Sequence, residues 1–156
     1  MGPRDVNMIS GSIVLEMRRT GIPVYPLGGV CVIDVADVCA AQIAAAERGR
    51  TGERYILGGE NLWHRDMLAI TAEVVGRKPP RIGLSRGVMR ALAAVADFLR
   101  DRLKVPLPAN GEQLRFSAET FWFDSGKARR ELGLAKRPYA ESARRTFEWY
   151  REHGIM

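Results

Sequence analysis

A strand-like segment, a helical segment and a second strand-like segment follow one another between residues 21 and 59. Residues 21–35 are rich in β-branched and aromatic side chains, and Gly28-Gly29 supplies a turn within them, which predicts a hairpin-like pair. Asp37 can then cap an apolar, alanine-rich helix that ends with Gly49 in the left-handed conformation. A short strand follows at residues 54–57. The order strand, helix, strand predicts a parallel α/β crossover.

The rest of the chain is predicted to be mainly helical, because apolar side chains recur every three or four residues and glycine or proline ends each run. Helices are predicted at residues 64–75, 86–103, 111–117, 124–133 and 139–154, with a small aromatic strand at residues 121–123. The longest helix carries one apolar stripe of Val88, Leu92, Val95, Leu99 and Leu103. This stripe is predicted to be the face that packs.

Length and composition indicate one globular domain. The chain has 156 residues, of which 46% are hydrophobic and 27% charged. Charged residues interrupt both of the longest apolar stretches, residues 30–46 and 88–99, so no transmembrane helix is predicted. The first ten residues lack the apolar core of a signal peptide, and a cytoplasmic location is therefore expected.

Cysteine and charge usage narrow the possible sites. Cys31 and Cys39 form no CxxC pair and have few possible imidazole partners, which predicts free, buried thiols and no metal site. The 24 basic and 18 acidic residues give a net charge of +6, spread along the chain without one dense run. Solvated helix faces explain most of this charge, so nucleic acid is an unlikely partner.

Five segments carry a family resemblance, and they occur in the family's order over essentially the whole chain. They are residues 2–5 (GPRD), 32–38 (VIDVADV), 52–59 (GERYILGG), 124–133 (DSGKARRELG) and the closing Trp149-Tyr150 with Gly154. With them, the chain resembles the second half of an extended short-chain dehydrogenase/reductase of the NAD-dependent epimerase/dehydratase family. Residues 47–50 (ERGR) and 58–62 (GGENL) are similar to the dihydroflavonol-reductase-like branch, which includes hopanoid-associated sugar epimerases.

The resemblance implies an α/β fold, helix-rich with short strands. Residues 1–156 would be the C-terminal, substrate-binding region of an extended Rossmann-type dehydrogenase whose N-terminal dinucleotide-binding part is absent. The chain would then be a fragment of an enzyme that acts on a sugar or on a hydroxyl or keto group. Its surface could self-associate where the missing half packs, through Val32, Val35, Ile56 and Leu57 as members of exposed strands.

The same resemblance assigns the candidate site residues. It places Gly2 and Pro3 at the turn beside the nicotinamide of the cofactor. It places the lip of the substrate pocket in the loop of residues 2–8 and the strand segment of residues 25–31, with candidate residues Arg4, Asp5, Met8, Tyr25 and Val30. Nucleotide-sugar epimerases of the family have a diphosphate-binding arginine at the position of Val30, so a substrate without a nucleotide is favoured, such as an uncharged polycyclic or isoprenoid-linked alcohol, ketone or sugar. Trp63 stands where the family usually has a serine or threonine helix cap, which predicts that the next helix starts from Asn61 or frays.

Two aspartates lie in the second of these segments. Asp37 is predicted to cap a helix rather than to act as a catalytic acid. Asp34 is placed on the strand before it, where a role in a cap network or at the surface is favoured over one in the cleft.

The chain lacks the family's cofactor and catalytic motifs. No G-x-x-G-x-x-G turn is present to bind the pyrophosphate of NAD or NADP. The position four residues after each of the four tyrosines, where the family has its catalytic lysine, holds glycine or alanine. We therefore expect no catalytic residue in this chain, no cofactor bound by it alone, and no activity without the other half.

Two other functions remain open. The chain could be a non-catalytic module that binds a protein partner or nucleic acid through its basic surface. Its aromatic side chains lie mainly on periodic apolar faces, however, whereas nucleic-acid modules interleave exposed aromatics with lysine and arginine. An independent enzyme with unrelated chemistry has little support, because no Ser-His-Asp group, metal cluster or phosphate loop is present.

Overall fold

The structure is a computed structural model that describes residues 1–7, 10–104 and 110–156. In chain order the elements are α1 (Ser12–Arg19), β1 (Val24–Pro26), β2 (Gly29–Val32), α2 (Val35–Arg48), β3 (Glu60–Trp63), α3 (His64–Val74), β4 (Ile82–Leu84), α4 (Arg86–Leu103), α5 (Gly111–Ser117), β5 (Thr120–Phe121), α6 (Gly126–Leu132) and α7 (Tyr139–Glu152). The expectation of a helix-rich α/β fold with short strands is therefore confirmed. None of these helices combines the length and apolar character needed to cross a membrane.

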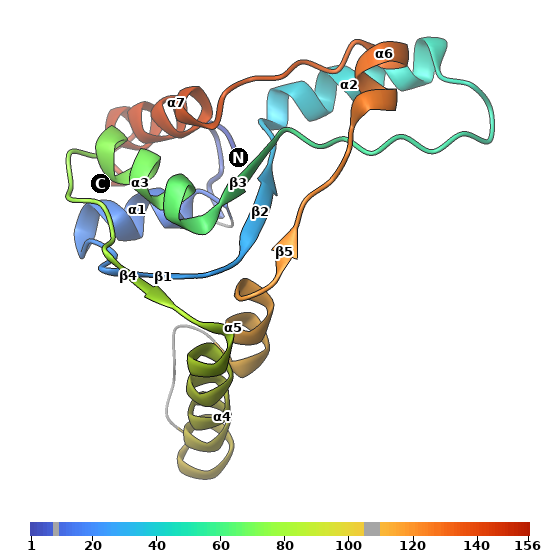
Figure 1. Cartoon of the computed structure of the whole chain (residues 1–156). Helices are drawn as coiled ribbons and strands as arrows, with labels where there is room; N and C mark the ends of the chain where they lie inside the picture. The colour runs from blue at the N-terminus through green and yellow to red at the C-terminus, as the bar shows by residue number, and fades with distance from the viewer. Residues whose placement is uncertain (8–9, 105–109) are drawn as a thin grey trace.

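Two small sheets connect the helices (Figure 1). The first pairs β1 with β4 in parallel. In the second, β2 is the central strand, antiparallel to β3 and parallel to β5. The predicted hairpin was wrong, because β1 and β2 belong to different sheets. The predicted parallel crossover was also wrong, since the strand after α2 returns antiparallel to β2.

Residues 54–57 do not form the predicted strand. They run as extended chain from the end of α2 toward β3, and no other strand of the described chain pairs with them. Side chains of α6 hold this segment instead. The Lys127 ammonium donates to the Arg54 carbonyl at 3.0 Å, and the Tyr55 hydroxyl donates to the Glu131 carboxylate at 2.8 Å. Ile56 is 53% exposed.

The predicted self-association surface is consequently not a sheet. Val32 lies on β2, but Val35 lies in the first turn of α2, and Ile56 and Leu57 lie outside any strand. Val35 and Ile56 are nevertheless exposed. The apolar surface is thus present, while its predicted origin in paired strands was wrong.

Two hydrophobic cores hold the helices. One joins α1 to α3 through Val14, Met17, Leu68, Ala72 and Val75. The other joins α2 to α6 through small side chains and leucines, namely Ala41, Ala44, Ala128, Leu132 and Leu134. α7 packs on α3, and the buried Tyr139 and Thr71 hydroxyls lie 2.7 Å apart.

Several local predictions differ from the structure. Gly49 has φ −67° and ψ 145°, an extended rather than a left-handed conformation. The thiols of Cys31 and Cys39 are free as predicted, but Cys39 is exposed and Cys31 only partly buried. α3 begins at His64 without a side-chain cap from Trp63, and Asn61 lies in β3 rather than at the helix start.

The packing face of α4 was also predicted wrongly. α4 packs on α5, and its buried side chains are Met89, Ala93 and Ala96. The predicted stripe lies on another face, where Val88, Leu92, Val95 and Leu103 are all exposed. Periodicity located an apolar face correctly but could not show whether the described chain covers it.

Asp34, not Asp37, caps α2. Its carboxylate accepts a hydrogen bond from the Ala36 amide at 2.9 Å and one from the Ser142 hydroxyl of α7 at 2.7 Å. The guanidinium of Arg145 lies 3.5 Å away and that of Arg137 lies 3.8 Å away. Burial alone would raise the pKa of Asp34, but these donors and cations together hold it below its usual range. The carboxylate is therefore charged at neutral pH and joins two helices.

Removing this carboxylate should destabilise the fold. We expect Asp34→Ala to lower the free energy of unfolding at pH 7 by about 2–4 kcal/mol, because a cap and a buried, paired charge are both lost. The pKa of Asp34 is lower in the folded state, so its stabilisation is complete above about pH 4 and is lost as pH falls through the folded-state pKa. Urea unfolding of wild type and variant at pH 7 and pH 3 measures both effects.

Asp101→Asn is the matched control, since Asp101 pairs with Arg100 on an exposed helix surface. It should change the free energy of unfolding far less than the Asp34 substitution does, because solvent screens an exposed pair. A similar loss in both variants would show that Asp34 has no special role.

Candidate functional site

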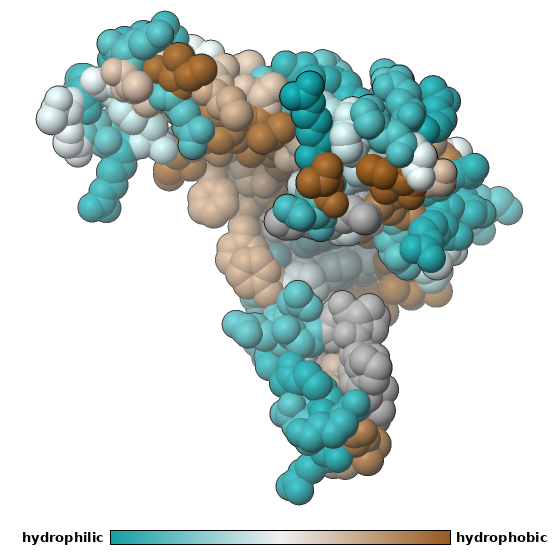
Figure 2. All heavy atoms as spheres, turned by 180° about the vertical axis from the view of Figure 1, so that it is seen from behind, coloured by the Kyte–Doolittle hydropathy of each residue, from teal (hydrophilic) through white to brown (hydrophobic). Residues whose placement is uncertain are grey.

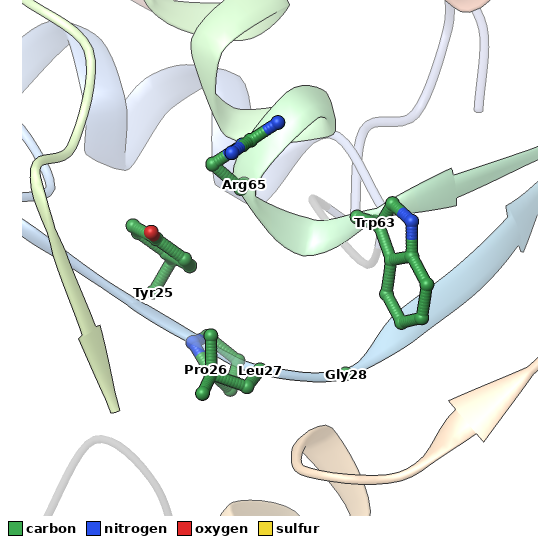
Figure 3. A pocket seen from close by; sticks show the side chains of 6 residues that line it. All are labelled: Tyr25, Pro26, Leu27, Gly28, Trp63 and Arg65. Atoms are coloured by element: carbon green, nitrogen blue, oxygen red, sulfur yellow. The ribbon is translucent and has the colours of Figure 1, made fainter. Parts of the chain in front are cut away.

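The end of β1 and the two residues after it line a hollow of about 270 Å³ (Figure 3). Tyr25, Pro26, Leu27 and Gly28 form one side of it. Trp63, the last residue of β3, and Arg65, in the first turn of α3, form the other. The lining is mainly apolar and aromatic with one charged side chain, as is common for small-molecule sites.

Gly28 fixes the position of this segment. A Cβ atom there would lie 2.4 Å from the Glu119 carbonyl oxygen and 2.5 Å from that of Ser117. The segment is therefore in close contact with the connection between α5 and β5. The Gly28 carbonyl also accepts a hydrogen bond from the His64 amide at 3.0 Å, which ties the hollow's two sides together.

Two tryptophans lie beside each other at the edge of the hollow. Trp63 is 47% exposed and Trp122 is 42% exposed, and their rings meet edge to face with centroids 4.6 Å apart. Gly29 makes room for this pair, because a Cβ atom there would lie 2.6 Å from the Trp122 Nε1 atom. The pair presents aromatic surface to solvent beside the hollow.

The hollow carries little net charge. The Arg65 guanidinium is paired with the neighbouring Asp66, Nε to Oδ1, at 3.0 Å. Burial lowers the pKa of His64, only partly offset by a hydrogen bond with the Gly28 backbone, so this imidazole is neutral at pH 7. A neutral or apolar ligand therefore fits this surface better than a polyanion does.

A second, more polar hollow of about 500 Å³ is lined in part by Trp122. Asn61, Asp124, Arg129 and Lys136 are among its lining residues. The Arg129 guanidinium is held through Nη2 by the Gly59 carbonyl at 3.0 Å. Within the described residues, no cluster of histidine, cysteine and carboxylate side chains could hold a metal ion.

The sequence-predicted site residues are not brought to one place. Tyr25 lines the hollow, whereas Val30 lies on β2, half-buried and in register with Leu62 and Phe121. None of Gly2, Pro3, Arg4 and Asp5 lines that hollow. Met8 lies outside the described residues.

The N-terminal segment instead packs on Asp34 and on the start of α1. Gly2 is buried, and a Cβ atom there would lie 2.5 Å from a methyl group of Val35. Arg4 is exposed with φ 68°. The Asp5 carboxylate accepts a hydrogen bond from the Gly11 amide at 2.7 Å. These contacts are structural, and the assignment of all these residues to cofactor or substrate stays a prediction.

Leu27 falls within the segment 25–31 that was predicted to border the pocket, whereas sequence reasoning missed Arg65 and the tryptophan pair. One signal was available for Trp63, which stands where a capping side chain is favoured and leaves α3 without a side-chain cap. No sequence signal connects Trp63 to Trp122, because they meet only through the pairing of β3 and β5 with β2.

Comparisons with known proteins match the chain to half of longer enzymes. It is 30% identical over 167 aligned residues to a Synechocystis protein that carries the name dihydroflavonol 4-reductase, covering all of this chain and 47% of that protein. It is 26% identical to sterol demethylase protein B of Methylococcus capsulatus, covering all of this chain and 48% of that protein. No protein-family model matches the chain.

Solved structures give the same result for the fold. A nucleoside-diphosphate-sugar epimerase from Pseudomonas aeruginosa superposes with a TM-score of 0.80 and 29% identity, over 100% of this chain and 46% of the other. The UDP-glucuronic acid 4-epimerase from Bacillus cereus, solved with NAD, superposes with a TM-score of 0.61 at 14% identity, over 97% of this chain and 42% of the other. The fold resembles the C-terminal portion of epimerase and short-chain dehydrogenase/reductase structures. The predicted resemblance is thereby confirmed, and the chain spans about half the length of the relatives it matches.

Gly28→Ala should disrupt the candidate site, because the added methyl group meets two backbone carbonyl oxygens that cannot rotate away. We expect a loss of about 2 kcal/mol or more in the free energy of unfolding. Gly87→Ala is the matched control: it lies in α4, where the nearest atom to the added Cβ is 3.9 Å away, and it should stabilise by up to about 1 kcal/mol. Equal stability of the two variants in urea unfolding would contradict the packing at Gly28.

Proposed function

We propose that this chain is the substrate-binding part of an NAD(P)-dependent reductase or epimerase that acts on a hydroxyl or keto group, and that it is inactive alone. The observation that carries the proposal is the match of the entire chain to about half of a reductase and of a sugar epimerase. The sequence contains neither the glycine-rich turn nor the Tyr-x-x-x-Lys pair of the family. The cofactor, the proton transfer and the hydride transfer would then belong to the other half.

The role of the described residues in this function is to bind and orient the substrate. Tyr25, Leu27 and Trp63 would surround it with apolar and aromatic surface. Arg65, already paired with Asp66, offers only a partly neutralised cation. This supports an uncharged, ring-containing alcohol, ketone or sugar over a nucleotide sugar, in keeping with Val30 in place of a diphosphate-binding arginine.

A nuclear magnetic resonance experiment can report ligand binding in the hollow directly, because each of the three tryptophans gives one indole N–H signal. A dihydroflavonol, chosen from the name of one relative, should shift the Trp63 and Trp122 signals and leave the Trp149 signal unchanged. Trp149 lies in α7 and stacks on His153, the C-cap residue of that helix. Tyr25→Ala should weaken this binding by about tenfold, the effect of losing one aromatic contact.

UDP-glucose is the competing probe. Shifts at Trp63 with UDP-glucose but not with the dihydroflavonol would overturn the uncharged substrate class. No shift with either ligand would contradict a substrate-binding role of the hollow. Turnover of either ligand by the chain with NADH or NADPH would contradict the proposal that it is inactive alone.

A further inference from the structure

α4 and α5 form an arm that extends away from the sheets (Figure 1). α5 lies along α4, and the Asp97 carboxylate of α4 binds the Gly111 amide at 3.1 Å and the Arg115 guanidinium at 3.0 Å. At the base, the Arg86 guanidinium bonds to the Ala118 carbonyl at 3.3 Å and to the Glu119 carboxylate at 3.2 Å. The rest of α4 projects beyond these contacts.

One face of the arm is apolar and exposed. Val88, Leu92, Val95 and Leu103 recur at helical spacing, and they are 45%, 44%, 55% and 59% exposed. Phe98, near the far end, is 59% exposed. Hydrophobic side chains are visible near the free end of the arm, next to hydrophilic ones (Figure 2). A continuous exposed stripe of this length is a binding surface.

A second exposed apolar surface lies at the opposite end of the molecule. α2, α6 and the unpaired residues 54–57 lie there, far from the tip of α4 (Figure 1). That end has exposed apolar side chains of its own, including Ile43 and Ile56, and extended backbone without a strand partner in the described chain. The stripe on α4 is separate from that surface and can have an occupant of its own.

The charges of the arm indicate the kind of occupant. Asp97 and Asp101 are neutralised by Arg100, and Asp97 also by Arg115. Within the described chain Arg90 and Arg102 form no ion pair. Arg102 and Lys104 lie at the far end of α4, where Lys104 interacts electrostatically with Asp101. An amphipathic helix with a leucine-, valine- and phenylalanine-containing face and more cations than carboxylates matches the surface of an anionic bilayer.

We infer that α4 docks on an anionic membrane surface. Its apolar stripe enters the boundary between headgroups and acyl chains, and Arg102 and Lys104 bind the headgroup phosphates. The helix lies in the plane of the interface and does not cross the bilayer. Docking of this kind would not require the proposed substrate-binding role, since it uses none of the residues that line the hollow at Tyr25 and Trp63.

Vesicle flotation tests this inference, because protein that aggregates does not float with lipid. The chain should float with vesicles of phosphatidylglycerol and phosphatidylcholine, should float less as salt rises, and should bind pure phosphatidylcholine at least about tenfold more weakly. Leu92→Asp combined with Leu103→Asp should weaken binding to the anionic vesicles by about tenfold or more. Arg102→Gln combined with Lys104→Gln should weaken it by up to about thirtyfold, the effect expected for two lost cations at about 1 kcal/mol each.

Two controls separate docking from general effects of charge or folding. Ile43→Asp combined with Ile56→Asp makes the same change at the opposite apolar end and should leave flotation unchanged. Arg144→Gln combined with Arg151→Gln removes two exposed cations from α7 and should weaken binding less than the α4 pair does. Circular dichroism confirms that each variant keeps its helices.

Three results would overturn the inference. The first is a wild-type chain that does not float with anionic vesicles. The second is equal flotation of the wild type and the Leu92→Asp, Leu103→Asp variant. The third is a dimer in light scattering that this variant dissociates while vesicle binding is absent, which would show that a second copy covers the stripe.

Discussion

The buried Asp34 carboxylate is the interaction on which the body of this structure depends. It fixes the start of α2 through the Ala36 amide and fixes α7 through the Ser142 hydroxyl, and two arginines of the C-terminal region neutralise it. Gly2 packs against it, and the Met1 carbonyl accepts from the Val35 amide beside it. The carboxylate thereby joins three parts of the chain that are far apart in sequence: the N-terminal segment, the start of α2 and α7. A buried charge with this many donors specifies one arrangement, because each alternative would leave it unpaired.

Much of the helical structure could be predicted from the sequence, because periodicity and local end signals act within a few residues. α3, α4, α5 and α7 lie close to their predicted ranges, and left-handed glycines follow or end helices at Gly76, Gly133 and Gly154. The strands were harder, because pairing depends on distant segments. The turn at Gly28-Gly29 is a close approach to the backbone of residues 117 and 119 rather than a hairpin, and nothing local distinguishes the two.

The candidate site was only partly predictable for the same reason. The family resemblance pointed to Tyr25, which does line the hollow, but it also pointed to Gly2 and Asp5, whose contacts are with Asp34, Val35 and Gly11. Trp63 and Trp122 are 59 positions apart and meet because β3 and β5 flank β2. Gly29 leaves room for the contact between the two tryptophans, because the Trp122 indole lies against its Cα. This role of Gly29 can be recognised only in the structure.

The central proposal is that this chain is one part of a larger enzyme, in which residues 54–57 would pair with a strand that the described chain does not supply. Hydrogen exchange of the backbone amides tests it most directly. The account predicts that the Tyr55, Ile56 and Leu57 amides exchange rapidly in a monomeric chain, because they donate to no described residue, while the amides within α3 and α7 are protected. Protection of Ile56 comparable to that of α3, in a chain shown by light scattering to be a monomer, would contradict the account.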